Sequence, residues 1–76
     1  MDEIIEILSG LHPEIDAVSR EDLVDSGVID SFDIVSIIAE IRERFDVTVT
    51  AAHILPEHFN SARALWALVE QLTMDN

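Results

Sequence analysis

The sequence predicts an all-α domain, a small four-helix bundle with three main helices, one short third helix and a long structured first loop. Three observations favour it. Apolar residues recur at helical spacing in three segments, only two Gly and two Pro occur, and the one segment with strand-like alternation has no partner. At 76 residues the chain is expected to be one domain, 1–76, with 49% hydrophobic residues for its core. Such a core rarely contributes more than about 3–5 kcal/mol and leaves no room for a deep active site.

The first predicted helix, Met1–Leu11, is acidic and amphipathic. Ile4, Leu8 and Leu11 share one face, and acidic residues occupy the rest of the wheel. Pro13 prevents the helix from continuing.

Residues 12–30 form the predicted long loop. Ser19 and Asp22 have the spacing of a capping box, which predicts a short turn of helix through Leu23. Apolar residues along the loop are expected to pin it to the core: Ile15, Val18, Leu23, Val28 and Ile29. A structured loop of this length in a small domain is more often functional than not.

Asp30 or Ser31 is the expected N-cap of the second helix. Asp33 lies in its first turn, and Arg42 and Arg44 lie in its last, as the helix dipole favours. One stripe of this helix is predicted to be buried: Ile34, Ile37, Ile38, Ile41 and Phe45.

The last third of the chain predicts two further helices. Residues 46–50 alternate like a strand but are expected to be an extended connection. Pro56 suits the first turn of a short helix, 56–59, and Asn60 or Ser61 then caps a helix over 62–73. The buried face of that helix is predicted to carry Leu65, Trp66, Val69 and Leu72, flanked by Leu68.

The charge balance restricts the partners. The chain has 16 Asp plus Glu against four Arg and no Lys, a formal net charge of −12. The charge therefore argues against nucleic acid and anionic membranes as partners and favours a basic protein surface. Solubility alone would also explain the charge, but not the absence of Lys. Without Cys, neither disulfides nor thiolate metal sites can form, and no signal peptide or membrane span is recognisable, so a cytoplasmic location is expected.

The pair Asp30-Ser31 stands where the loop joins the second helix. A serine in a first helical turn is exposed, and the backbone N–H groups and the dipole there favour a negative group, which suits a phosphate ester. No neighbour in the sequence could act as a base for a nucleophilic serine. On these two residues alone an ordinary helix cap is the favoured interpretation.

The wider run Leu23–Ser31 closely resembles the modification-site signature of acyl carrier proteins, and the resemblance covers most of the chain. It implies the same four-helix bundle, with no enzymatic activity. Ser31 would receive 4′-phosphopantetheine from coenzyme A, added by a separate phosphopantetheinyl transferase. Asp30 would be the flanking acid that helps to present the serine. The arm would carry an acyl or aminoacyl group as a thioester.

The sequence departs from the fatty-acid carriers of this family after the serine. Phe32 replaces the usual Leu or Met, and Ser36, Arg42 and Arg44 stand where acidic residues are frequent. Fatty acid synthase partners are therefore in doubt. The run Leu23–Ser31, with the segments 57–61 and 68–72, looks more like stand-alone carriers loaded by adenylating enzymes, such as the D-alanyl carrier proteins. Fatty-acid, polyketide, peptide and cell-wall pathways all stay open.

The exposed side of the second helix is the expected docking face, formed by Phe32, Asp33, Ser36, Glu40 and Glu43. The resemblance implies three partners: the transferase, an adenylating loading enzyme, and a downstream acyltransferase or synthase with a basic docking surface. The domain is expected to be a monomer.

Two other classes compete with the carrier. A small acidic helical adaptor without a cofactor fits composition and periodicity equally well, and a hydrolase using Ser31 would need a base and an oxyanion site that the sequence lacks. His12, His53 and His58 lack metal-site spacing and are expected to be ordinary loop or surface residues, and no metal site is predicted. Trp66 is expected in the core, with the space that shelters an acyl chain in some carriers as the alternative.

Overall fold

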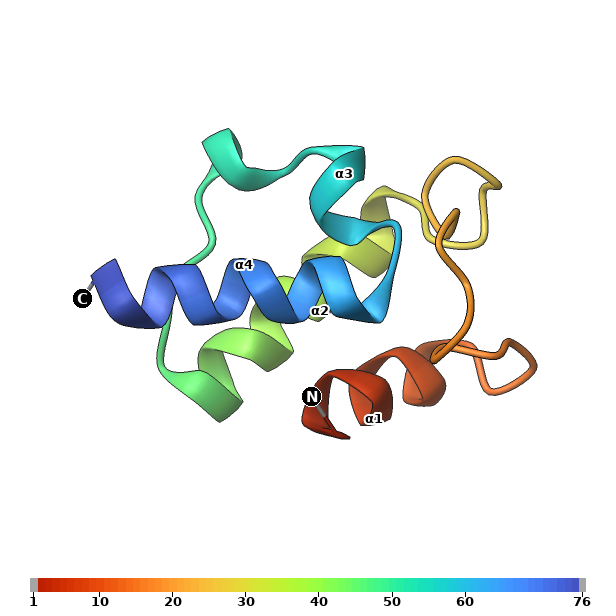
Figure 1. The fold of residues 1–76 in the computed structure, drawn as a ribbon, viewed down its shortest axis with the longest axis horizontal. Coiled ribbons are helices and arrows are strands. Elements are labelled where there is room, and N and C mark those ends of the chain that lie inside the picture. The colour runs from red at the N-terminus through yellow and green to blue at the C-terminus, as the bar shows by residue number, and fades with distance from the viewer. Residues whose placement is uncertain (1, 76) are drawn as a thin grey trace.

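The computed structural model describes residues 2–75, and Met1 and Asn76 lie outside the described range. Three longer helices and one short third helix form the bundle that the sequence predicts (Figure 1). The elements are α1 (Asp2–Leu11), α2 (Ser31–Phe45), the 3₁₀ turn η1 (Ala51–His53), α3 (Pro56–Phe59) and α4 (Ala62–Asp75). Within residues 2–75 there is no strand, and no helix is both long and apolar enough to cross a membrane.

Helix α4 is the centre of the bundle, because it packs against α1, α2 and α3 (Figure 1). The core lies between these helices and includes Phe59 from α3, which is 1% exposed. Fully burying one such large apolar side chain stabilises the fold by about 1.5–3 kcal/mol. At the edge of this core the rings of Phe45 and Trp66 pack at a centroid distance of 5.8 Å. Trp66 is therefore partly buried against the core rather than fully within it.

Helix α2 has the predicted cap and buried stripe. Asp30 is the N-cap and forms a capping box with Asp33. At the other end Asp46 adopts a left-handed conformation with φ of 57°, and its N–H donates to the carbonyl of Arg42. Ile37 and Ile41 are fully buried, and the rest of the stripe is partly buried: Ile34, Ile38 and Phe45.

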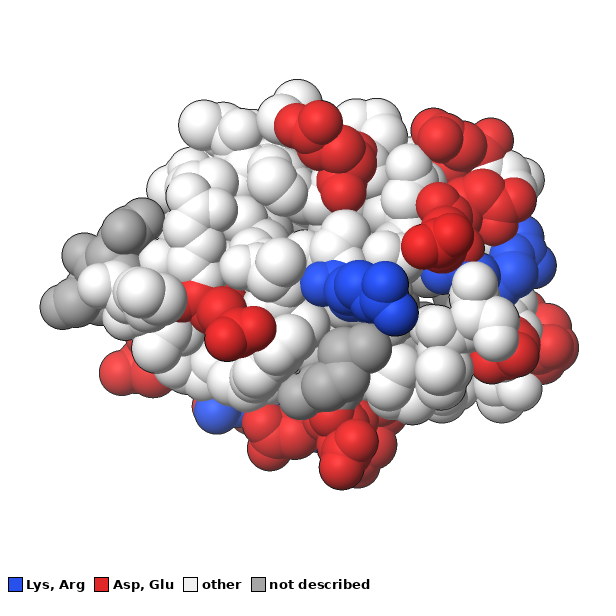
Figure 2. Space-filling model, in the orientation of Figure 1, with Lys and Arg blue, Asp and Glu red and all other residues white. Residues whose placement is uncertain are grey.

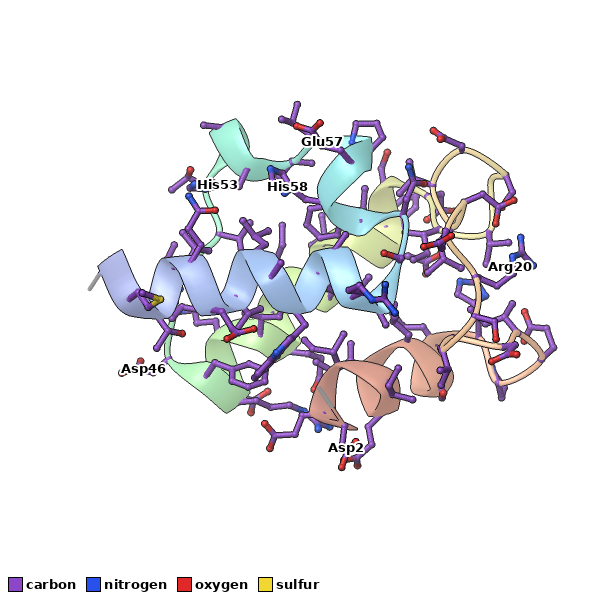
Figure 3. All side chains as sticks on the ribbon, in the orientation of Figure 1. Asp2, Arg20, Asp46, His53, Glu57 and His58 are labelled. Atoms are coloured by element: carbon purple, nitrogen blue, oxygen red, sulfur yellow. The ribbon has the colours of Figure 1, made fainter. Side chains whose placement is uncertain are left out.

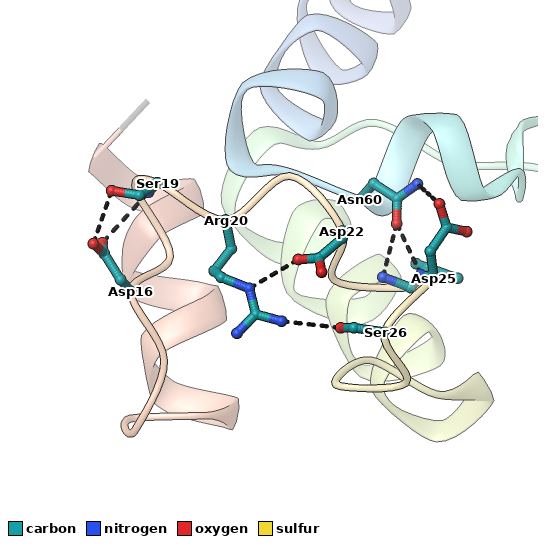
Figure 4. Close-up of polar contacts among 8 residues, drawn as sticks. Asp16, Ser19, Arg20, Asp22, Asp25, Ser26 and Asn60 are labelled. Carbon is teal, nitrogen blue, oxygen red and sulfur yellow. Dashed lines mark hydrogen bonds and ion pairs between the residues drawn. The ribbon is translucent and has the colours of Figure 1, made fainter.

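The short helix predicted at Ser19 does not form. The carboxylate of Asp16 accepts hydrogen bonds from the Ser19 N–H at 3.4 Å and from its hydroxyl at 2.8 Å (Figure 4). Ser19 is thus a donor in a turn that begins at Asp16, rather than the cap of a helix that follows. A second turn is closed by the Ser26 N–H, which donates to the Asp22 carbonyl at 2.7 Å.

The loop residues differ in how deeply they are buried, and the turn that begins at Asp16 explains one unexpected case. Leu23 and Ile29 are fully buried as predicted, and Ile15 and Val28 are partly buried. The prediction for Val18 is wrong, because it is 70% exposed. The preceding Ala17 is buried instead, since the Asp16 turn directs these two neighbours to opposite sides.

The segment 46–50 is an extended connection, as predicted. Val47 and Val49 are buried against the helices while Thr48 and Thr50 are exposed, so the alternation reflects packing on one side only. The turn η1 that follows was not predicted. Helix α3 has the predicted bounds, and α4 extends to Asp75, beyond the expected end.

Candidate functional site

Ser31 is the first residue of α2 and is exposed. Its two acidic neighbours are engaged with each other. Asp30 Oδ1 accepts from the Asp33 N–H at 3.0 Å, and Asp33 Oδ2 accepts from the Asp30 N–H at 3.3 Å. Among residues 2–75 the Ser31 hydroxyl has no hydrogen-bond partner, so it is available to a reagent from solvent.

The start of α2 offers a place for an anion. The N–H groups of Ser31 and Phe32 have no acceptor within the described chain, because the Asp30 side chain and carbonyl serve only Asp33 and Ile34. Free N–H groups and the helix dipole stabilise a negative group there, typically by about 0.3–1 kcal/mol. A negatively charged group attached to the exposed Ser31 would therefore be in a favourable electrostatic environment.

The long loop that leads to Ser31 is held by Asn60, between α3 and α4 (Figure 4). Asn60 Oδ1 accepts from the N–H groups of Val24 at 2.9 Å and Asp25 at 3.0 Å, and Nδ2 donates to Asp25 Oδ2 at 3.1 Å. The Asn60 carbonyl accepts from the Leu23 N–H at 3.0 Å. We call these four contacts the Asn60 clasp. The sequence predicts Asn60 or Ser61 as the cap of α4 but does not indicate the clasp. The cap is Ser61, whose hydroxyl accepts from the Ala64 N–H.

After the clasp the chain turns tightly towards α2. The Gly27 N–H donates to the Val24 carbonyl at 3.1 Å, and the Ile29 N–H donates to the Leu23 carbonyl at 2.9 Å. Gly27 has φ of +83°, a conformation that side-chain-bearing residues rarely adopt. Ile29 is 2% exposed, so the residue just before Asp30 is anchored in the core.

His12 belongs to the site, although the sequence predicts only an ordinary loop or surface histidine. Its Nε2 lies 2.8 Å from Asp33 Oδ2, and its Nδ1 lies 3.3 Å from Glu14 Oε1. The hydrogen bond to Asp33, helped by Glu14, raises the pKa of His12 against the opposing effect of burial. The same bond lowers the pKa of Asp33. No sequence signal reveals this contact, because the partners are 21 residues apart.

The other two histidines lie elsewhere. Figure 3 shows His53 on η1 and His58 on α3. His53 Nδ1 is 2.9 Å from the Thr50 hydroxyl. Within residues 2–75 no group of three His, Asp or Glu side chains could hold a metal ion. The imidazole of His12 is bonded to carboxylates rather than to Ser31, so the site has no serine–histidine pair.

The predicted docking residues on α2 differ in availability. Phe32 is 83% exposed, and Ser36 and Glu43 are also exposed. Asp33 is turned towards His12, and Glu40 accepts from Arg44 Nε at 3.2 Å. Val35, which the prediction omitted, is 65% exposed one turn after Phe32. The freely exposed part of α2 is therefore apolar near Ser31 and charged further along.

Carboxylates are unevenly spread over the surface. Figure 2 shows them gathered over the loop end of the molecule and along its lower edge, while the middle of this face, over α4, carries basic as well as acidic side chains among uncharged ones. The loop that leads to Ser31 thus lies in a negative field, which would speed encounter with a basic partner.

Comparison with known proteins gives a consistent result. The model of the family described as "Phosphopantetheine attachment site" matches residues 2–69, a range that includes Asp30 and Ser31. D-alanyl carrier proteins of Streptococcus sanguinis (strain SK36), Streptococcus gordonii (strain Challis) and Streptococcus thermophilus (strain LMD-9) are each 35% identical to this chain over 71 residues. These alignments cover 92% of this chain and 90% of each relative.

Proposed function

The chain belongs to the phosphopantetheine attachment-site family, and on that premise we propose that Ser31 is the residue to which 4′-phosphopantetheine is attached. The domain is a carrier protein rather than an enzyme, and its cofactor is covalently bound. It works with a phosphopantetheinyl transferase and with enzymes that load or transfer its cargo.

One observation carries the assignment to Ser31. It is an exposed serine with a free hydroxyl at the N-terminus of a long helix, and it lies inside the matched region. The two free N–H groups beside it would receive the charge of the phosphodiester. Asp30, as N-cap, keeps the first turn in shape, so its role as flanking acid is one of presentation.

When bound, the arm supplies a terminal thiol that can hold an acyl group as a thioester, a group that this Cys-free chain otherwise lacks. The residues around Ser31 anchor the arm and do no chemistry on the cargo. Because the anchor is exposed, the tethered group is presented at high effective concentration to whichever enzyme docks.

For the cargo we propose an aminoacyl group, with D-alanyl as the first candidate, loaded by an adenylating enzyme and passed to a downstream acyltransferase. Similarity to the D-alanyl carrier proteins over most of the chain supports this choice. The proposed docking face is the exposed side of α2, led by Phe32 and Glu43, with Ser36, Asp33 and Glu40 beside them. The carrier is proposed to act as a monomer in the cytoplasm.

The test is the intact mass after incubation with coenzyme A and a broad-specificity phosphopantetheinyl transferase. The wild-type chain should gain one phosphopantetheine, and Ser31→Ala should gain none. Ser26→Ala, which changes an exposed serine in the loop before α2, is the matched control and should be modified like the wild type. Modification of Ser31→Ala, or none of the folded wild type, would reject the assignment.

The modified protein then tests the cargo. Incubated with ATP and an enzyme that adenylates D-alanine, it should gain one alanyl group that hydroxylamine removes, as expected for a thioester. Unmodified protein is the control. Loading by fatty-acyl transferases instead would reject the aminoacyl proposal while leaving Ser31 as the attachment site.

A further inference from the structure

The contact between His12 and Asp33 connects α1 to the start of α2. The His12 N–H donates to the Leu8 carbonyl at 2.9 Å, which continues the helical bonding of α1 by one residue. Leu8 is 1% exposed, so the helix end from which the His12 side chain projects is anchored in the core. Its Nε2 meets Asp33 Oδ2 at 2.8 Å, and both side chains are largely shielded, at 23% and 20% exposure.

The oxygen of Asp33 that meets His12 also meets the backbone beside Ser31. Asp33 Oδ2 accepts from the Asp30 N–H at 3.3 Å, and Asp30 is the N-cap that immediately precedes Ser31. One carboxylate oxygen thus joins the imidazole to the first turn of α2. Any movement of the Asp33 side chain changes both contacts.

We propose that His12 is a positioning residue for the attachment site, which through Asp33 holds the first turn of α2 so that Ser31 is presented to the transferase in one orientation. The inference rests on the proposed function, in which Ser31 is the residue modified. It implies that phosphopantetheine transfer to Ser31 is fastest when the His12 ring is protonated, because the protonated imidazole holds the first turn of α2 best.

The donor count explains why the proton matters. Each ring nitrogen of His12 faces a carboxylate: Nε2 faces Asp33 from α2, and Nδ1 faces Glu14 from the loop. A carboxylate only accepts, so both nitrogens must carry hydrogen, and this is true only of the protonated imidazole. The neutral ring has one N–H and leaves one carboxylate without its donor.

The direction of the pH effect follows from these contacts. Asp33 first, and then Glu14, raise the pKa of His12 above its ordinary value of 6.5. The contribution of the bridge is therefore complete below pH 6.5 and is lost as the pH rises through the higher pKa of the folded state. Asp33, with its lowered pKa, stays ionised throughout this range.

The first measurement is an NMR titration of the unmodified protein from about pH 5.5 to about pH 9, the range in which histidines titrate. The Ser31 amide should shift with the same midpoint as the His12 ring and should stop doing so in His12→Gln. His53→Gln is the matched control, because its ring contacts Thr50 far from Ser31 in the chain, and it should leave the Ser31 titration unchanged.

The second measurement is the rate of phosphopantetheine transfer at limiting carrier, given as the ratio of wild type to His12→Ala. The pH dependence of the transferase itself cancels in this ratio. We expect roughly threefold at low pH, the size of a weak, partly shielded charge interaction. Above the pKa of His12 the ratio should fall to the smaller effect that the single N–H of the neutral ring retains. His12→Gln, which can still donate to Asp33, should recover part of the rate with no pH dependence of the ratio.

The outcomes separate this inference from the proposed function. A Ser31 amide that ignores His12, or a rate ratio that stays flat at one for folded variants, overturns the positioning role while modification of Ser31 proceeds. A merely structural bridge would lower the melting temperature of His12→Ala without moving the ratio, and that result also overturns it. Failure of the wild type to be modified at every pH would reject the proposed function and this inference with it.

Discussion

At the level of single residues, Ser31 is available although it lies between two acidic residues. Asp30 and Asp33 bond to each other's backbone, and Asp33 also bonds to His12, while within residues 2–75 neither carboxylate accepts from the Ser31 hydroxyl. A carboxylate that accepted from the hydroxyl would tie it to the protein. The capping box therefore stabilises α2 and leaves Ser31 exposed at the same time.

Phe32 has no structural reason to be aromatic, because it is 83% exposed. If it enters an apolar pocket of a docking enzyme, Phe32→Ala should raise the KM for loading about tenfold, the usual effect of truncating a central interface aromatic, and leave the melting temperature unchanged. Loading kinetics at several carrier concentrations measure this. Met74→Ala, which removes a side chain that is 84% exposed near the other end of the chain, is the control. Equal effects of both changes would argue against docking through Phe32.

At the level of elements, the Asn60 clasp makes the loop and α3 depend on each other. A four-residue helix has almost no stability of its own, and α3 is held by the buried Phe59 and by the contacts that follow it. Because those contacts reach Leu23, Val24 and Asp25, the short helix also holds the loop before Ser31.

Asn60→Ala should therefore lower the free energy of unfolding by about 0.5–1.5 kcal/mol, since it removes the acceptor of the part-buried Val24 N–H and of the exposed Asp25 N–H. Hydrogen exchange should speed up at the amides of Val24 and Asp25 before it changes in α2. Asn60→Asp keeps the acceptor but places a second carboxylate against Asp25, so its free energy of unfolding should be no higher than that of Asn60→Ala. Ser61→Ala, which removes only the cap of α4, is the control. Unchanged exchange at Val24 in Asn60→Ala would contradict this account.

The two glycines provide a second comparison at this level. A methyl group at either would meet no atom within 4 Å, so only the backbone conformation differs. Gly10 lies within α1, and Gly10→Ala should raise the free energy of unfolding by about 0.5–1 kcal/mol. Gly27 has φ of +83°, and Gly27→Ala should lower it by about 1 kcal/mol. Urea denaturation of both variants measures the difference, and equal signs would contradict it.

At the level of the whole molecule, the net charge of −12 is hardly compensated. The ion pairs of arginine within residues 2–75 are on the surface: Arg20 with Asp22, and Arg44 with Glu40 and Glu6. Exposed pairs of this kind contribute little. The negative charges of the folded state therefore still repel one another, and the same charges create a field that attracts basic partners.

The melting temperature should accordingly rise with NaCl up to about 0.5 M, where the Debye length has fallen below the spacing of most surface charges. Thermal denaturation at constant pH measures it. A variant with the exposed Glu3, Glu21 and Glu70 changed to Gln should have a higher melting temperature at low salt and a smaller rise. A flat response in the wild type would mean that the charges are neutralised locally.

Much of this protein follows from its sequence alone, because the deciding signals are local. The spacing of Ile37 and Ile41 predicts the buried side of α2, Asp30 predicts its start, and Pro56 predicts α3. The position of Ser31 in a first helical turn follows from the same cap. Each of these signals lies within about one or two helical turns of the feature it determines.

Only the tertiary structure decided how the long loop is held. A capping-box spacing at Ser19 predicted a helix. In the structure the Ser19 N–H, which a capping box would pair with the Asp22 side chain, donates to the carboxylate of Asp16 and closes a turn instead. The contact of His12 with Asp33 joins residues 21 apart, and the Asn60 clasp joins residues that are 35 to 37 apart, Asn60 with Leu23, Val24 and Asp25. No periodicity encodes such pairs, because they meet only after the helices pack and bring distant polar groups within hydrogen-bond distance.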